Sequence, residues 1–183
     1  SESLITVRRG ARGGARVQLP KAEVAARYAG LILQHKGTTL EDLYVARSLI
    51  EPQAVGLLAR SHSDEDIVRL RDAVAHEPSD SRVGTVRSHE HFHALLIELT
   101  GNQTLQVLIG IIEHLLSSAD WSRLDPDQDS ASIREASQRS LRAHHKVIDL
   151  IEAGDDEGAA DLWRRHLIGT KDYVTRGNVK TVL

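Results

Sequence analysis

Histidines are concentrated at one point of this sequence, where three of five consecutive residues carry an imidazole. His89, His91 and His93 open the apolar stretch SHEHFHALLIELTGN. On an α-helix, residues four apart share a face and residues two apart nearly oppose each other, so His89 and His93 point together and His91 points away. Imidazoles that converge in space are ligands for divalent metals such as zinc or nickel. The question is therefore whether the shared face looks toward water or into a site.

The apolar spacing around the histidines predicts that they point inward. We call a seam a series of residues three and four apart that lies on one face of a helix and packs into the core. Three expected helices each carry histidine on such a seam. The seams are Val86, His89, His93, Leu96 and Thr100; Leu141, His144, Ile148 and Ile151; and Ala159, Trp163, His166 and Thr170. The other histidines lie off the seams or near loops and are predicted to be solvated: His35, His62, His76, His91, His114 and His145.

His144 and His166 are predicted to face each other across a helical hairpin. His144 is ten residues before Gly154 and His166 is twelve after it, so at about 1.5 Å per residue their heights differ by about 3 Å.

A single inward histidine is usually a core residue with a hydrogen-bonded ring. Four together weaken that interpretation, because each unpaired polar group in a core costs roughly 1–3 kcal/mol. Since the chain has no cysteine, the four histidines favour a metal site, with zinc first and nickel second.

Arg47 also lies on an inward seam, together with Leu43, Ile50, Ala54 and Leu57. A guanidinium in a core needs an anion. One candidate is Glu51, one turn further along the helix. The other is a bound carboxylate or phosphate, which arginine holds through two parallel hydrogen bonds. Spacing alone favours Glu51.

Two enzymatic functions are alternatives to a sensing site. Glu90 and His93 form Glu-x-x-His, half of a di-iron signature, but the matching positions on the later helices are Trp163 and Leu141, which argues against a di-iron enzyme. A mononuclear metal-dependent hydrolase or lyase stays open, since three histidines with an open position suit water activation. Glu90 is its only neighbouring acid and lies about 100° around the helix from His89. A structural metal site without a ligand response is a third alternative.

The bulk composition predicts one soluble domain rich in helix. The 183 residues are 40% hydrophobic and 27% charged with a formal net charge of −3, which argues against a protein that coats nucleic acid. No apolar run is long enough to span a membrane and no signal peptide is visible, so a cytoplasmic protein is expected. The chain starts at Ser1 and has no methionine, so a fragment of something longer is also expected.

The order of elements predicts an all-α antiparallel bundle of six to seven helices behind a short β-hairpin. Helices are expected over about 21–36, 39–61, 63–77, 81–100, 102–120, 132–153 and 155–176. Thr39 is a candidate N-cap, and Pro52 is expected to bend or split its helix. Before Pro20, ITVRRGARGGARVQLP predicts two strands around a glycine-rich turn. Its basic residues make it either a flexible tail or a DNA-contacting wing: Arg8, Arg9, Arg12 and Arg16.

From about residue 21 to 176 the chain resembles the FCD effector-binding domain of GntR-family transcription regulators. The matching stretches, in the family's order, are LYVARSLIEPQAVGLLA, FHALLIELTGN and HHKVIDLIEAGDDEGAADLWRRHL. ITVRRGARGGARV resembles the last strands of that family's winged-helix DNA-binding domain. The resemblance divides the chain into a wing-like hairpin remnant, 1–20, and a helical effector-binding and dimerisation domain, 21–183.

The resemblance also implies roles for individual residues. The family's metal ligands fall on His89, His93, His144 and His166, with His89 in place of the usual aspartate or asparagine. Arg47 matches an arginine that faces the effector, which reverses the preference for Glu51 as its partner. The resemblance thus implies a sensor and not an enzyme: a homodimer that binds a divalent metal and a small carboxylate effector. Operator DNA would be bound by the intact protein, through recognition helices expected before Ser1.

Overall fold

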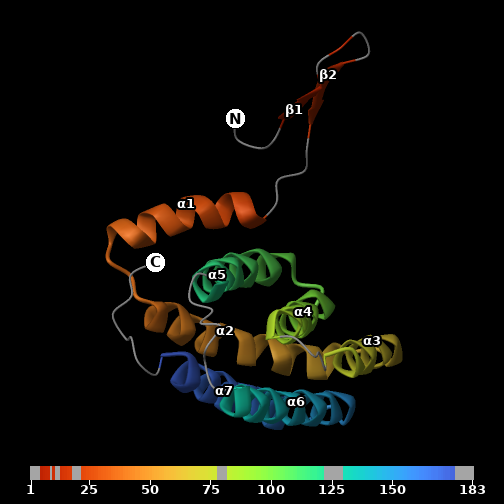
Figure 1. Cartoon of the computed structure of the whole chain (residues 1–183). Coiled ribbons are helices and arrows are strands. Elements are labelled where there is room, and N and C mark those ends of the chain that lie inside the picture. The colour runs from red at the N-terminus through yellow and green to blue at the C-terminus, as the bar shows by residue number, and fades with distance from the viewer. Residues whose placement is uncertain are drawn as a thin grey trace.

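The computed structural model describes residues 5–8, 10, 13–17, 22–77, 82–121 and 130–175. Within these ranges the chain forms a two-stranded hairpin followed by seven helices (Figure 1). The elements are β1 (Ile5–Arg8), β2 (Gly14–Val17), α1 (Ala22–His35), α2 (Leu40–Ser61), α3 (Asp64–Ala75), α4 (Arg82–Leu99), α5 (Gln103–Trp121), α6 (Ser130–Glu152) and α7 (Asp156–Thr175). The predicted fold class, a helical bundle behind a β-hairpin, is confirmed.

The helix α2 begins at the predicted cap and runs through the middle of the bundle. The Thr39 hydroxyl accepts a hydrogen bond from the Asp42 N–H at 3.2 Å, and the Asp42 carboxylate accepts one from the Thr39 N–H at 2.9 Å. This reciprocal pair is a capping box, which satisfies two of the free N–H groups at the start of a helix. Pro52 lies inside α2 without splitting it. The cap and the unbroken helix together carry Arg47 and Glu51 into the core.

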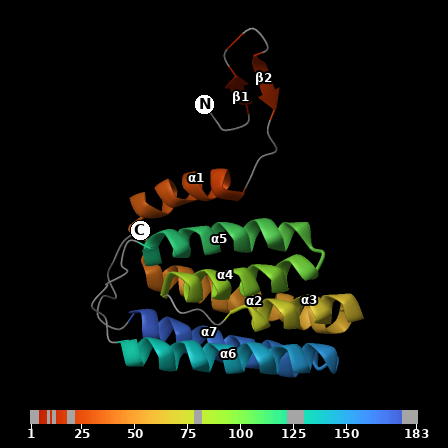
Figure 2. The ribbon, with the colours of Figure 1, turned by 45° about the vertical axis from the view of Figure 1, so that its right-hand side comes forward.

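The packing is layered around α2. Figures 1 and 2 show α1 resting on α5 at one side of the bundle and the α6–α7 hairpin at the other, with α2 and α4 between them. α2 packs most extensively on α7. The two helices approach closely at Gly56, where an added Cβ would lie 3.1 Å from the backbone oxygen of Asp156. The main apolar core joins α2, α3, α4, α6 and α7, and its largest fully buried side chain is Trp163.

The hairpin lies apart from this bundle. β1 and β2 pair antiparallel, with Ile5 opposite Val17 and Arg8 opposite Gly14. Among the described residues the two strands contact only each other. Arg8 and Arg16 are exposed on them, whereas Arg9 and Arg12 lie outside the described residues. A basic hairpin is therefore present, and its contact with DNA stays a prediction.

Candidate metal centre

Three histidines from three helices converge in the core. His93 comes from α4, His144 from α6 and His166 from α7, and one ring nitrogen of each lies within 4.8 Å of those of the other two. Their ring centroids are 5.1 to 5.4 Å apart. His93 and His144 are buried and His166 is half-buried. The seams thus converge as the spacing predicts, and His144 faces His166 across the α6–α7 hairpin. That they bind a metal stays a prediction.

Aromatic side chains hold the three rings away from water. The His144 ring stacks on Phe92 with centroids 4.3 Å apart, and Trp163 lies 4.5 Å from His93 and 4.8 Å from His166. Burial in these surroundings is the main reason that the pKa of each of the three histidines is well below its ordinary value. The imidazoles are therefore neutral at neutral pH, which is the state that binds a metal.

The hydrogen bonds indicate which ring nitrogens are available. His144 donates from Nδ1 to Glu77 Oε1 at 2.6 Å, and its Nε2 is buried with no hydrogen-bond partner among the described residues. Nε2 of His93 and Nε2 of His166 lie 3.4 Å apart. An orphaned buried nitrogen beside two other imidazole nitrogens is costly as it stands and fits a divalent transition metal with nitrogen ligands. The three residues therefore suit such a metal in the tautomer in which His93 donates from Nδ1 to Glu51 Oε2, because accepting there from Arg47 would leave the proton on Nε2.

Glu51 connects this group to Arg47. The Glu51 carboxylate is fully buried, accepts a hydrogen bond from Arg47 Nε and another from Trp163 Nε1 at 3.0 Å, and lies 3.3 Å from His93 Nδ1. Arg47 Nη2 contacts the same His93 nitrogen. Burial alone would lower the pKa of Arg47, but the carboxylates of Glu51 and Glu113 raise it above its ordinary value, so the guanidinium stays charged. Arg47 therefore pairs with Glu51 and borders the histidines, and its role in binding an effector stays a prediction.

His89 is the sequence-predicted ligand that lies outside the group of three. Its Nε2 is 3.6 Å from Glu77 Oε2, and its ring centroid is 5.2 Å from that of His144. Burial lowers the pKa of His89, and the charge of Glu77 opposes that shift. His89 thus borders the centre through Glu77, and its role as a fourth ligand stays a prediction.

Two buried acids near the centre were not singled out from the sequence. Glu77 follows α3 and is 2% exposed, and burial raises its pKa to about 7. Glu113 on α5 lies 3.8 Å from Arg47, and burial together with the charge of Glu51 raises its pKa to about 8. Glu113 had a signal, since it is the only acid in the apolar run QVLIGIIEHLL. Glu77 had one too, since it continues the inward series Ile67, Leu70 and Val74 at spacings of three and four, although α3 itself ends at Ala75.

The remaining histidines do not take part in this group. Five of them are exposed, as predicted: His35, His76, His91, His114 and His145. His62 is half-buried, with its Nδ1 3.0 Å from the backbone oxygen of Ala59.

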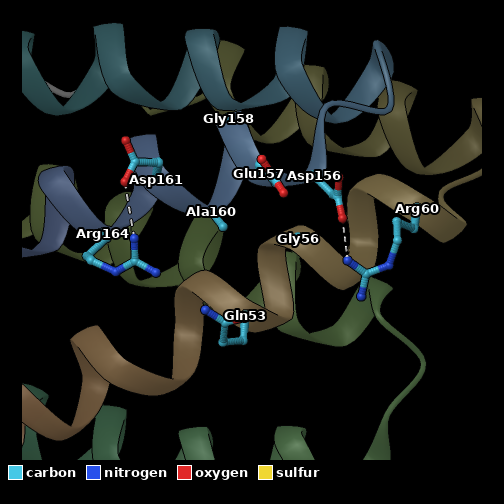
Figure 3. Close-up of a pocket in the computed structure, with 9 residues that line it drawn as sticks. All are labelled: Gln53, Gly56, Arg60, Asp156, Glu157, Gly158, Ala160, Asp161 and Arg164. Atoms are coloured by element: carbon cyan, nitrogen blue, oxygen red, sulfur yellow. Dashed lines mark hydrogen bonds and ion pairs between the residues drawn. The ribbon is translucent and has the colours of Figure 1, made fainter.

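A separate hollow lies on the outer side of the α2–α7 contact (Figure 3). Its volume is about 510 Å³, and none of its lining residues is a histidine. Its two arginines already pair with carboxylates of the same hollow, Arg60 with Asp156 at 2.5 Å and Arg164 with Asp161 at 3.1 Å. These charges are neutralised locally, so no ligand site is assigned there.

Comparison with known proteins agrees with the fold and with the sequence motifs. The FCD domain family matches residues 42–169, which is more than half of the chain. The Nta operon transcriptional regulator of Aminobacter aminovorans is 28% identical over 89 residues, and the match spans 47% of this chain but only 42% of that relative.

Among the described residues, no helix has the length and apolar character needed to cross a membrane.

Solved structures share the fold at low identity. A Streptococcus agalactiae GntR structure has a TM-score of 0.68 at 18% identity, covering 94% of this chain and 76% of that chain. The Escherichia coli McbR/YncC structure has a TM-score of 0.60 at 11% identity, covering 93% and 77%. These likenesses concern the fold alone. With the family match over residues 42–169, they lead to one assignment: the chain belongs to the FCD domain family.

Proposed function

We propose that this chain is the effector-sensing domain of a GntR-type transcription regulator that binds a divalent metal and a small organic acid at one site. The observation that carries the proposal is the convergence of His93, His144 and His166, all held neutral by burial, beside the charged guanidinium of Arg47. Zinc is the first expectation for a site of this kind, and nickel the second. A metal held there supplies a Lewis acid to which the carboxylate of an effector can bind.

Arg47 is proposed to hold the same carboxylate. Glu51 engages the guanidinium at Nε, whereas Nη2 is directed to His93 and so borders the proposed metal ligands. The NH₂ edge of the guanidinium is then the part that donates hydrogen bonds to a small anion. His89 is proposed as a fourth ligand, because it lies one turn before His93 and its ring is 5.2 Å from that of His144.

A sensing role is preferred to a catalytic one. A hydrolase or lyase at this site needs a general base that is free to take a proton from water. The two buried carboxylates in contact with the proposed ligands, Glu51 and Glu77, are engaged by Arg47 and Trp163 in one case and by His144 in the other. The geometry therefore favours holding a ligand over converting it.

In the intact protein, effector binding is proposed to change the affinity for operator DNA, as a coupling free energy between two sites of a homodimer. The exposed Arg8 and Arg16 of the hairpin are suited to contact phosphates. The name of the Aminobacter aminovorans relative, a transcriptional regulator, supports this role. A cytoplasmic location accompanies it.

The first test is the metal content of the purified chain. Elemental analysis should give about one transition metal per chain for the wild type and close to none for His144→Ala. His145→Ala is the matched control, because His145 is the next residue and is exposed, so it should keep the metal. A wild type that holds no metal and takes up neither zinc nor nickel would contradict the metal site.

The effector is tested by thermal shift with a panel of small mono- and dicarboxylates. A stabilising acid should lose its effect in Arg47→Met and in protein stripped of metal, and keep it in Arg60→Met, which removes an exposed arginine from the same helix. Equal shifts in all four samples would refute the joint site.

A further inference from the structure

Glu77 is a buried carboxylate in a position that packing alone does not explain. It follows the C-cap of α3, where its N–H donates to the Val74 oxygen at 3.1 Å, and only 2% of the residue is exposed. A carboxylate in an apolar core is costly unless other groups bind it. The side chain points to the histidines of α4 and α6 and not to solvent.

The two oxygens of Glu77 face two different histidines. Oε1 accepts the 2.6 Å hydrogen bond from His144 Nδ1, and Oε2 lies 3.6 Å from His89 Nε2. Oε2 has no hydrogen-bond partner among the described residues. The carboxylate thus lies between the Nδ1 side of His144 on one helix and the half-buried His89 on another.

The bond to Nδ1 determines what the other side of the His144 ring does. A ring that donates from Nδ1 is in the tautomer whose Nε2 carries a lone pair. The two ring nitrogens point in roughly opposite directions. Glu77 therefore lies on the side of His144 away from His93 and His166, and it cannot reach an ion bound at Nε2 while it keeps this bond.

We propose that Glu77 is the positioning residue of the metal centre: it fixes the tautomer and orientation of His144 from behind, while its second oxygen faces His89 at 3.6 Å. This inference rests on the proposed metal site and assigns a role to a residue outside the four histidines. A carboxylate behind a ligating imidazole makes the ring a stronger ligand, and removing such a partner typically weakens metal affinity by about 10- to 100-fold.

Three variants of the full 183-residue chain test the role. Glu77→Gln keeps an oxygen that can accept from Nδ1 but loses the charge, and Glu77→Met keeps the approximate length but loses the acceptor. Asp72→Asn is the control, because it removes an exposed charge from the preceding turn of α3. The zinc dissociation constant, measured by competition with a chromophoric chelator, should rise about 10-fold in Glu77→Gln and up to about 100-fold in Glu77→Met, and stay unchanged in Asp72→Asn.

Two further readouts separate positioning from general support of the fold. Ring ¹⁵N chemical shifts of metal-free protein should show His144 as the Nδ1–H tautomer in the wild type and in Glu77→Gln, and show this preference lost in Glu77→Met. The visible absorption spectrum of bound Co²⁺ should change in band position and intensity in Glu77→Met. Melting of metal-free Glu77→Gln should match the wild type closely enough to show that the fold is intact.

The outcomes distinguish this inference from the proposed function. A wild type that binds zinc while both Glu77 variants bind it equally well, with an unchanged His144 tautomer, overturns the role of Glu77 and leaves the metal site standing. A wild type that binds no metal overturns both. If Glu77→Met does not fold, the affinity of Glu77→Gln alone decides, and an affinity equal to that of the wild type refutes the positioning role.

Discussion

Replacing Glu51 with methionine should be among the most destabilising single changes in the described core. Glu51 is fully buried and accepts hydrogen bonds from Arg47 Nε and Trp163 Nε1. The Arg47 side chain is 11% exposed, so water cannot replace the carboxylate that it loses. The change would leave a guanidinium and an indole N–H in the core without their acceptor.

The magnitude follows from these two losses. An ion pair broken by removal of one buried partner costs about 3–5 kcal/mol. The lost hydrogen bond of Trp163 adds about 1 kcal/mol. In a domain of this size about 1 kcal/mol shifts the Tm by roughly 2–4 °C, so a total of about 4–6 kcal/mol lowers the Tm by roughly 8–24 °C.

A double-mutant cycle in urea separates the ion pair from packing. The measurements use Glu51→Met, Arg47→Met and the double variant, all with chelator present so that metal binding does not contribute. The double variant removes both charges and should lie within about 1–2 kcal/mol of the wild type, because apolar replacement of a buried pair is often close to neutral. A loss under about 2 kcal/mol in Glu51→Met, or a double variant that equals the sum of the two singles, would refute the reasoning.

Three further predictions concern the cap, the metal and pH. Thr39→Ala removes the capping box of α2 and should lower the free energy of unfolding by about 1 kcal/mol. The control Ser61→Ala, at the other end of the same helix, should change that free energy by under about 0.5 kcal/mol. Equal losses in the two variants would show that the cap does not matter. Zinc at about 100 times its dissociation constant should stabilise the chain by about 2.7 kcal/mol, seen as a rise in Tm that chelator reverses, and an unchanged Tm would argue against a folded-state site. Because burial raises the pKa of Glu113 from 4.5 to about 8, ionisation of its carboxyl costs the folded chain stability as pH rises from about 4.5 to 8. The lowered pKa of the buried histidines acts in the opposite direction below about pH 6.5, so the contribution of Glu113 is measured as the difference between metal-free wild type and Glu113→Gln. In urea titrations at about pH 5, 6.5 and 8, the stability of Glu113→Gln relative to the wild type should rise with pH; a difference that does not change with pH would contradict the assignment.

The helical frame and the convergence of three histidines were predictable because both follow from local periodicity. Spacing three and four apart places His93, His144 and His166 on inward faces. Because His144 and His166 lie at similar numbers of residues from the turn at Gly154, they are predicted to lie at nearly the same height along the α6–α7 hairpin. In the structure their ring centroids are 5.1 Å apart. These inferences need only the regular rise and turn of an α-helix.

The parts of the centre that were missed depend on contacts between distant segments. Glu77 reaches His144 across 67 positions of sequence, and helix spacing does not tell which histidine it meets. His89 was placed on the correct face, but helix spacing does not tell whether its ring reaches the other histidines or turns to Glu77. Pro52 is predicted to bend or split its helix, and the structure shows that α2 is not split there. In each case tertiary contacts decide what local sequence leaves open.

Because α2 packs most extensively on α7, the time at which the core can fold depends on when α7 is synthesised. α2 is complete at Ser61, but its main packing partner begins only at Asp156. At ordinary translation rates, on the order of 5 to 20 s separates the two on the ribosome. During that interval the buried face of α2, including Glu51, lacks the indole of Trp163. His166 is also the last of the three converging histidines to be synthesised, so the three rings can come together only when the final helix has left the ribosome and docked.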